Sequence, residues 1–367
     1  MLPEPESEAL AASRTLMERI RRELADSGNW IGFARYMELA LYEPGLGYYA
    51  GGAAKLGAPG DFATAPELGT LYARTLARQV AELLQPGESI LEFGAGSGAL
   101  AEALIAELSP ENYLILETSA ELRARQEARL GTRAHWIERL PERFRGVMLA
   151  NEVADAMPVH AVAWRAGGVM ERGVTAADGS LAWAERPASG ELLAAARALE
   201  VPVPYESEIG LVARAWMKLL AARLERGALL VVDYGFPRRE YYHPQRAMGT
   251  LMCHYRHRAH GDPFFHPGLQ DITAHVDFST LAAAAHEGGL EVLGFAGQAQ
   301  FLVNCGITEI LEREDAADAV RYAPQAAQAQ KLLSPAEMGE IFKVLAVGRG
   351  VSQPLLGFAQ GDRAHAL

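Results

Sequence analysis

The stretch "ILEFGAGSGAL", residues 90–100, places three glycines within five positions directly after an apolar run. Glycine accepts positive φ angles and, having no Cβ, lets a ligand touch the backbone. The motif Glu92-x-Gly94-x-Gly96-x-Gly98 differs from the dinucleotide fingerprint G-x-G-x-x-G, because the third glycine comes one residue early. A turn of this kind between a buried strand and a helix is where an α/β protein binds a nucleotide or nucleoside. The stretch therefore predicts a nucleoside site.

Predicted strands alternate with predicted helices on both sides of this turn. Residues 99–108 and 119–130 have helical patterns. The strand candidates are residues 89–96, 112–118, 133–140, 145–153, 228–235, 290–295 and 342–350. This alternation predicts an α/β fold with a doubly wound, mostly parallel sheet.

Two regions interrupt the alternation. Residues 7–24 and 31–41 have helical patterns ahead of the first strand, and residues 159–186 contain short β-like runs with glycine turns. The predicted organisation is an N-terminal helical cap (1–85), a core (86–158 and 228–350), an inserted β/helical lobe (159–227), an active-site loop (235–277) and a tail (351–367).

A carboxylate follows the second strand of this core. Glu117 lies about twenty residues after the glycines, where dinucleotide folds place an acid that accepts hydrogen bonds from ribose hydroxyls. The glycine turn and Glu117 together predict a site for S-adenosyl-L-methionine (SAM). Two alternatives stay open: a dinucleotide site, and a tight turn without a ligand beside a solvated Glu117.

Polar side chains also follow the apolar run at residues 145–150. They are Asn151, Glu152 and Asp155, and in a doubly wound methyltransferase the end of this strand faces the transferred methyl group. Two carboxylates can bind a guanidinium in bidentate fashion and can accept a proton from it. We therefore take these three residues as catalytic candidates. The alternative is structural: Asp155 would cap a turn before Pro158, and Glu152 would satisfy loop amides.

A long segment rich in histidine and arginine comes next, at residues 231–278. It holds six of the ten histidines, with aromatic residues throughout. We predict that the loop at residues 235–277 closes over the substrate. Its arginines could engage an acidic surface of a partner, or could pair with Asp61, Glu67 and Glu152 of this chain. The candidate residues for the substrate and this loop are Asp61, Glu67, Asp233, Tyr234, His257 and His260. No H-E-x-x-H or Cys/His pairing accompanies the histidines, so we expect no metal.

The composition argues against several other classes. The formal net charge of -12 disfavours binding to nucleic acid, which needs a basic surface. No apolar stretch is long enough to span a bilayer, so no membrane insertion is expected. The acidic N-terminus lacks the features of a signal or transit peptide, and the two cysteines fit a reducing compartment. We therefore predict a cytoplasmic protein, or one whose targeting segment is already absent.

The sequence resembles the MidA (mitochondrial dysfunction A) methyltransferases over roughly residues 30–350. The matching segments are "YMELALYEPGLGYY" (36–49), "GDFATAPELG" (60–69), "LEFGAGSGAL" (91–100), "LETSAELRARQ" (116–126), "NEVADAMPV" (151–159), "VVDYGF" (231–236) and "GTLMCHYRHRAHGDPFFHPGLQDITAHVDFSTL" (249–281). The resemblance implies a class I SAM-dependent methyltransferase fold, which is Rossmann-like. Mitochondrial members of this family are complex I assembly factors that dimethylate an arginine of a complex I subunit.

The resemblance also implies roles for individual residues. The three motif glycines match the cofactor loop, Glu117 matches the ribose acid, and Asn151 and Glu152, with Asp155, match the acidic segment after the strand. Ser97 departs from the family, which often has a bulky or basic residue between the last two glycines. That departure puts any extra contact from this position in doubt.

The resemblance favours a protein-arginine methyltransferase with SAM as cofactor and a protein substrate such as a respiratory complex subunit. Two alternatives stay open. One is a SAM-binding assembly factor whose docking surface, not its chemistry, is the main role. The other is a small-molecule methyltransferase, which would need a deeper and more apolar pocket than the paired acids suggest.

Overall fold

The computed structural model describes residues 2–51, 64–315, 318–352 and 354–367. Contacts between residues divide the chain into two compact units. The lobe unit comprises residues 1–62, 155–215 and 238–277, and the core unit comprises residues 63–154, 216–237 and 278–367. This division differs from the domain boundaries drawn from the sequence, which stay a prediction. Each unit has its own sheet and its own hydrophobic cluster, described in turn below.

The core unit contains a mixed sheet in the order β15-β16-β10-β5-β2-β3-β4. Its strands are β2 (Ser89–Phe93), β3 (Asn112–Leu116), β4 (His135–Trp136), β5 (Phe144–Asn151), β10 (Leu224–Phe236), β15 (Glu291–Gly297) and β16 (Phe342–Arg349). The strands from β10 to β4 run parallel, and β16 is antiparallel to both β10 and β15. The predicted α/β fold with a mostly parallel sheet is therefore confirmed.

Apolar runs explain why β5 and β10 lie at the centre of this sheet. Residues 147–150 and 228–232 are buried throughout, as is usual for parallel strands covered on both faces. Val231 of β10 aligns with Ala150 of β5 on one side and with Leu345 of β16 on the other.

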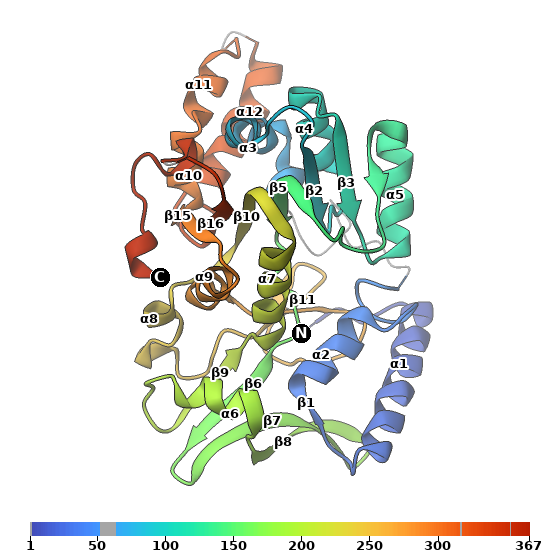
Figure 1. Ribbon diagram of the computed structural model, residues 1–367. Coiled ribbons are helices and arrows are strands. Elements are labelled where there is room, and N and C mark those ends of the chain that lie inside the picture. Colours follow the sequence, from blue (N-terminus) through green and yellow to red (C-terminus); the bar gives the residue numbers. More distant parts are fainter. Residues whose placement is uncertain (1, 52–63, 316–317, 353) are drawn as a thin grey trace. The chain divides into compact units, whose positions relative to one another are not determined.

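Helices cover the core sheet, as Figure 1 shows. They are α3 (Thr70–Leu83), α4 (Ala99–Leu108), α5 (Ala120–Leu130), α9 (Phe278–Glu287) and α10 (Gln298–Asn304). Helices α11 (Ile307–Glu312) and α12 (Ala319–Leu333) pack against α3 and α10. Short 3-10 turns are η1 (Ala65–Leu68), η2 (Gly131–Arg133), η4 (Leu356–Phe358) and η5 (Ala364–Ala366). Helix α7 (Leu211–Arg223) belongs partly to each unit.

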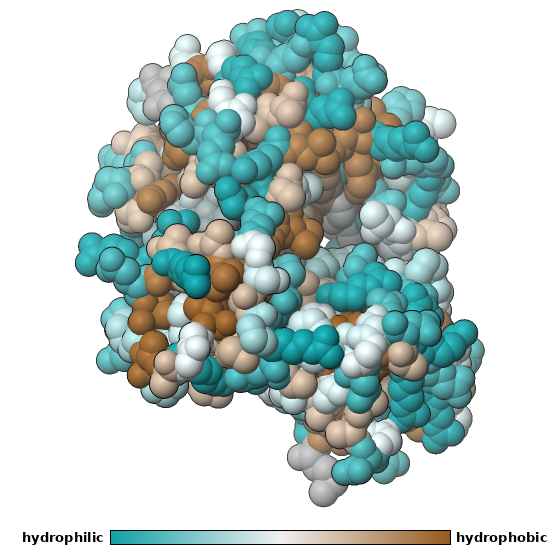
Figure 2. Space-filling model, turned by 60° about the horizontal axis from the view of Figure 1, so that its bottom comes forward, coloured by the Kyte–Doolittle hydropathy of each residue, from teal (hydrophilic) through white to brown (hydrophobic). Residues whose placement is uncertain are grey.

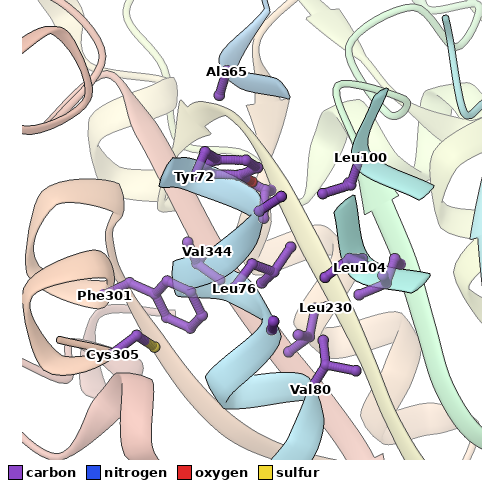
Figure 3. Packing of buried hydrophobic residues seen from close by; sticks show 14 of the residues in the cluster. Ala65, Tyr72, Leu76, Val80, Leu100, Leu104, Leu230, Phe301, Cys305 and Val344 are labelled. Carbon is purple, nitrogen blue, oxygen red and sulfur yellow. The ribbon is translucent and has the colours of Figure 1, made fainter. Parts of the chain in front are cut away.

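Helix α3 is the centre of the core unit's hydrophobic cluster. Tyr72, Leu76 and Val80 lie on one side of the helix at helical spacing and are fully or almost fully buried. They pack with side chains of α4, β10, β16 and α10, including Leu104 and Phe301 (Figure 3). Burying such side chains stabilises the unit by roughly 1.5–3 kcal/mol each before entropy is counted.

The lobe unit contains an antiparallel sheet in the order β1-β7-β6-β9, with β8 beside β7, and a smaller sheet in the order β12-β11-β13. The strands of the larger sheet are β1 (Ile31–Gly32), β6 (His160–Arg165), β7 (Gly168–Ala177), β8 (Ser180–Pro187) and β9 (Tyr205–Ile209). Those of the smaller sheet are β11 (Met252–Tyr255), β12 (Arg258–His260) and β13 (Asp271–Thr273), and β14 (Val276–Asp277) follows. The antiparallel insertion expected within residues 159–186 is thus observed as β6, β7 and β8.

The helices of the lobe unit are α1 (Ser7–Asp26), α2 (Phe33–Tyr42), α6 (Gly190–Arg197) and α8 (Arg238–Tyr241), with a 3-10 turn η3 (Pro244–Arg246). Helices α1 and α2 bury Leu16, Ile20, Tyr36 and Met37 in a second hydrophobic cluster. Contacts thus group these two N-terminal helices with β7 and β6 rather than with α3.

Figure 2 shows one face on which hydrophilic residues surround smaller groups of hydrophobic ones. Among the described residues, exposed large apolar side chains such as Met248 and Val203 come from separate segments of the chain. Single exposed apolar residues are normal on a protein surface. No helix in the described ranges has the length and apolar character needed to cross a membrane.

Candidate functional site

The glycine turn between β2 and α4 uses backbone conformations that favour glycine. Gly94, Gly96 and Gly98 have φ angles of 58°, 55° and 80°. A Cβ at Gly94 would lie 3.5 Å from Cγ2 of Val153, which is ordinary contact, so conformation rather than space requires glycine there. The three glycines themselves place no side chain over the main chain of this turn. The turn therefore fits a ligand that approaches the backbone closely.

Glu117 lies next to this turn, at the end of β3. The amide of Gly94 donates to the carbonyl of Leu116 at 3.0 Å, which ties the turn to that strand. Oε1 of Glu117 accepts a hydrogen bond from the amide of Ser119 at 2.9 Å. Burial raises the pKa of the Glu117 carboxyl above its ordinary value, while hydrogen bonds from Ser119 and Gln126 lower it. The structure thus brings Glu117 and the glycines together.

Gln126 of α5 links the two, and the sequence reasoning missed it. Its Nε2 donates to the carbonyl of Gly96 and to Oε2 of Glu117, at 2.9 Å each. Its Oε1 accepts from Nε1 of Trp136 at 2.8 Å. Gln126 is fully buried on the face of α5 that also carries Leu122 and Leu130. The sequence does hold a signal for Gln126. It lies on the apolar face of a predicted helix, and a side-chain amide buried there needs hydrogen-bond partners.

Glu92 lies beneath the glycine turn on β2 and is almost fully buried. Its Oε2 accepts a 2.6 Å hydrogen bond from the hydroxyl of Tyr113 on β3. The pKa of Glu92 is raised to about 7, because burial, aided by the charge of Glu117, outweighs the lowering effect of the Tyr113 hydrogen bond. Glu92 therefore binds protons near neutral pH.

Ser97, the residue that departs from the family pattern, is bonded on two sides. Its hydroxyl donates to Oε1 of Glu67 in η1. Nη1 of Arg129 on α5 donates to the Ser97 carbonyl at 3.0 Å and to its hydroxyl at 2.7 Å. Glu67 thus contacts the glycine turn. Asp61, the other acid predicted with Glu67, lies outside the described residues.

Asn151 is the last residue of β5 in the core unit, and Glu152 follows it. The hydroxyl of Tyr72 donates to Oδ1 of Asn151 at 2.6 Å, and Nδ2 of Asn151 donates to Oε1 of Glu152 at 3.2 Å. Glu152 has a φ angle of 53°, which is rare for a residue with a side chain. Its amide donates to the carbonyl of Val232 at 2.8 Å. The carboxylate of Glu152 is therefore oriented by Asn151 and by an unusual backbone conformation.

Asp233 anchors the same loop from the end of β10. It is fully buried. Its Oδ2 accepts from the amides of Val153 and Ala154 at 3.2 and 2.9 Å, and its Oδ1 accepts from the amide of Tyr234 at 2.9 Å. Tyr234 itself packs edge-on against Phe342, with ring centroids 5.5 Å apart. The carboxylate of Asp233 thus holds the backbone of the loop after β5 through hydrogen bonds.

The remaining candidates belong to the lobe unit. Asp155 is buried there, and its carbonyl accepts from the amide of Ala274 at 3.0 Å. His257 lies in the turn between β11 and β12 with a φ of 61°. His260 lies on β12, and burial lowers the pKa of its imidazole. Within the described ranges, no three His, Cys, Asp or Glu side chains are grouped as metal ligands would be. The expectation of no metal stays a prediction.

A protein-family model matches residues 71–296, and the family is described as "Putative S-adenosyl-L-methionine-dependent methyltransferase". The match covers β2, the glycine turn, Glu117 and the loop after β5. Among curated proteins, the chain is similar to "Protein arginine methyltransferase NDUFAF7 homolog, mitochondrial" of Drosophila melanogaster, with 28% identity over 97% of this chain and 91% of that protein. It is also similar to the Danio rerio "Protein arginine methyltransferase NDUFAF7, mitochondrial", with 27% identity over 91% and 87% of the two chains.

Two solved structures from Burkholderia thailandensis are similar over the whole chain. One is bound to S-adenosyl-homocysteine, is 49% identical, covers 100% of both chains and has a TM-score of 0.96. The other, a native structure, is 48% identical with the same coverage and a TM-score of 0.94. The glycine turn and Glu117 fit the nucleoside cofactor that this family uses. The chain belongs to this family of S-adenosyl-L-methionine-dependent methyltransferases.

Proposed function

We propose that this methyltransferase modifies the guanidinium of an arginine in a partner protein, such as a subunit of a respiratory complex. Two things support the proposal: the names of the NDUFAF7 relatives, which are 27–28% identical to this chain, and the acidic loop after β5. The single observation that carries it is the carboxylate of Glu152, held by Asn151 at the carboxyl end of a parallel strand. We also propose that the protein acts in the cytoplasm.

SAM would be held by the glycine turn and by the acids around it. Gly94, Gly96 and Gly98 would let it approach the main chain, and Glu117 would accept hydrogen bonds from its ribose hydroxyls. When bound, SAM supplies an electrophilic methyl group on a sulfonium. Gln126 would keep the ribose acid at a fixed distance from the turn, because it bonds both.

Glu152 would bind the acceptor and take up a proton. A guanidinium is cationic and must lose a proton when one of its nitrogens gains a methyl group. A carboxylate can hold the guanidinium through charge-assisted hydrogen bonds and can accept that proton. Asn151 would orient Glu152, and Asp155 stays the third catalytic candidate.

The conformation of Glu152 is maintained by the surrounding structure. A residue with a side chain in the left-handed region costs of order 1–3 kcal/mol. The bond from its amide to Val232 and the bonds that Asp233 accepts from Val153 and Ala154 offset this cost. Strain retained in this way is typical of residues positioned for chemistry.

The test is methyl transfer from isotopically labelled SAM to proteins extracted from cells that lack this protein, with arginine methylation read by mass spectrometry. The native enzyme should label arginines, and Glu152→Gln should not, although it should still bind SAM. Glu337→Gln, which changes an exposed acid of the core unit, is the control and should behave as the native enzyme. Label on lysine or on small molecules, or unchanged activity in Glu152→Gln, would contradict the proposal.

A further inference from the structure

We propose that Tyr72 is a positioning residue for methyl transfer: its hydroxyl fixes the side-chain amide of Asn151, and Asn151 in turn fixes the carboxylate of Glu152. The proposal rests on the role proposed above for Glu152 and adds a residue of helix α3 to it. The sequence patterns did not indicate Tyr72. All three residues belong to the core unit.

Tyr72 lies in the first turn of α3, which two hydrogen bonds tie to helix α12. Oε1 of Gln328 accepts from the amide of Leu71 at 3.2 Å, and Nε2 of Gln328 donates to the carbonyl of Gly69 at 2.9 Å. The ring of Tyr72 packs in the hydrophobic cluster of the core unit, with 1% of the residue exposed (Figure 3). Because a side chain packed in this way sits in one rotamer, the hydroxyl of Tyr72 has a defined position.

The hydroxyl of Tyr72 is a hydrogen-bond donor. Its oxygen lies 2.6 Å from Oδ1 of Asn151. Burial raises the pKa of Tyr72 well above its ordinary value, and the charges of Glu152 and Glu92 raise it further. The hydroxyl therefore keeps its proton at neutral pH and can donate it to the amide oxygen of Asn151.

This donor determines which way the amide of Asn151 faces. A side-chain amide has an oxygen that accepts and a nitrogen that donates. When Oδ1 accepts from Tyr72, Nδ2 faces Glu152 and donates to its Oε1 at 3.2 Å. The reverse orientation would place Oδ1 against a carboxylate, which only accepts hydrogen bonds when it is ionised. Tyr72 and Glu152 therefore select the same orientation of Asn151.

These hydrogen bonds connect the interior of the core unit to an accessible carboxylate. Tyr72 is buried, whereas Asn151 and Glu152 are partly exposed. Without a buried donor, a partly exposed amide can turn over and bond water with either end. The hydroxyl of Tyr72 thus contributes to holding Glu152 in place before the methyl group is transferred, and such positioning lowers the barrier.

The first experiment measures methyl transfer from labelled SAM to the extract of cells that lack this protein. Tyr72→Phe removes the hydroxyl and keeps the ring. The maximal rate at saturating SAM should fall about tenfold, which is within the range of coupling inside one hydrogen-bond network. The KM for SAM should stay near the native value, because the bonds of Gln126 to the glycine turn and to Glu117 are kept.

Two further variants separate positioning from packing. Thr75→Val is the matched control, because it removes another fully buried hydroxyl of α3, and it should keep the native rate. The second variant is Asn151→Ala, which removes the group through which Tyr72 would act. Tyr72→Phe should lower the rate in the native chain and should not lower it further in Asn151→Ala. A packing role would instead give equal effects in both backgrounds.

The second experiment needs no methyl acceptor. The asparagines of the chain are Asn29, Asn112, Asn151 and Asn304. Labelling asparagine with ¹⁵N therefore gives few side-chain amide signals in NMR, and Asn151→Ala identifies those of Asn151. In the native chain loaded with S-adenosyl-homocysteine, the hydrogen bond to Glu152 should shift one of these signals away from the position of a water-exposed amide. Tyr72→Phe should return it toward that position, and Thr75→Val should not.

A native Asn151 signal at the position of a water-exposed amide, or a native transfer rate in Tyr72→Phe, would overturn the positioning role. If arginines were nevertheless methylated in the extract, the proposed function would stand without Tyr72. Conversely, the expected Asn151 signals together with Tyr72-dependent transfer to an acceptor other than arginine would uphold the positioning role and overturn the proposed function.

Discussion

The side-chain amide of Gln126 donates a 2.9 Å hydrogen bond to Oε2 of Glu117. The same nitrogen bonds the carbonyl of Gly96, so one buried side chain couples the cofactor turn to the acid proposed to bind the ribose. The turn, the acid and helix α5 therefore form one hydrogen-bonded unit.

Replacing Gln126 should therefore weaken cofactor binding. In Gln126→Leu, the indole of Trp136 and the carbonyl of Gly96 lose their bonds to this side chain, at a cost of about 1–3 kcal/mol for each group left unsatisfied. We expect about tenfold lower affinity for SAM by calorimetry. The control is Gln330→Leu, which changes an exposed position on α12. Native affinity for SAM in Gln126→Leu would show that the turn keeps its shape without the hydrogen bonds of Gln126.

A bulky residue at Gly96 should abolish SAM binding. Gly96 has a φ of 55°, so Gly96→Val strains the turn and places methyl groups where the ligand approaches. Gly87→Val is a matched control, because Gly87 also has a positive φ, of 79°, with open space around its Cβ position. Both variants should lose stability, but only Gly96→Val should lose SAM affinity. Equal SAM affinity of the two variants in calorimetry would exclude this turn as the cofactor site.

Glu92 should make stability depend on pH. Burial raises the pKa of Glu92 to about 7 from 4.5, so the folded chain binds this proton more tightly than the unfolded chain. Its contribution is fully present below pH 4.5 and is lost as the pH rises through about 7. Over this window the native protein should lose up to about 3 kcal/mol relative to Glu92→Gln, from the size of the shift. Urea unfolding at several pH values measures the free energy of unfolding of both proteins. The same pH dependence in the native protein and in Glu92→Gln would contradict the prediction.

Asp233 should affect catalysis rather than cofactor binding. In Asp233→Asn, one oxygen that accepts from loop amides is replaced by an NH₂ group, which cannot accept. The loop carrying Glu152 should then lose its fixed conformation, and kcat should fall at least tenfold while the KM for SAM stays near the native value. Steady-state kinetics with labelled SAM gives both constants. A rise in KM with an unchanged kcat would mean that Asp233 serves the cofactor instead.

Much of the core unit could be predicted from sequence because its signals are local. Apolar runs mark β2, β3, β5 and β10, and the spacing of glycines and Glu117 follows from one strand-turn-helix-strand unit. The roles of Gln126 and of Glu67 could not be predicted in this way. Each depends on a helix or turn that returns to the glycine loop from elsewhere in the chain, and spacing alone does not reveal such contacts.

The polar residues at the end of β5 illustrate the same limit. Asn151, Glu152 and Asp155 are close in sequence, but contacts assign Asp155 to the lobe unit and the other two to the core unit. Likewise, spacing alone did not indicate that the carboxylate of Asp233 accepts hydrogen bonds from three backbone amides.

A crystal structure of this protein grown with S-adenosyl-homocysteine tests the central claim most directly. We predict that both ribose hydroxyls lie within hydrogen-bond distance of Glu117 and that the nucleoside contacts the main chain at Gly96. A nucleoside bound away from this turn, or ribose hydroxyls beyond hydrogen-bond distance of Glu117, would contradict the account.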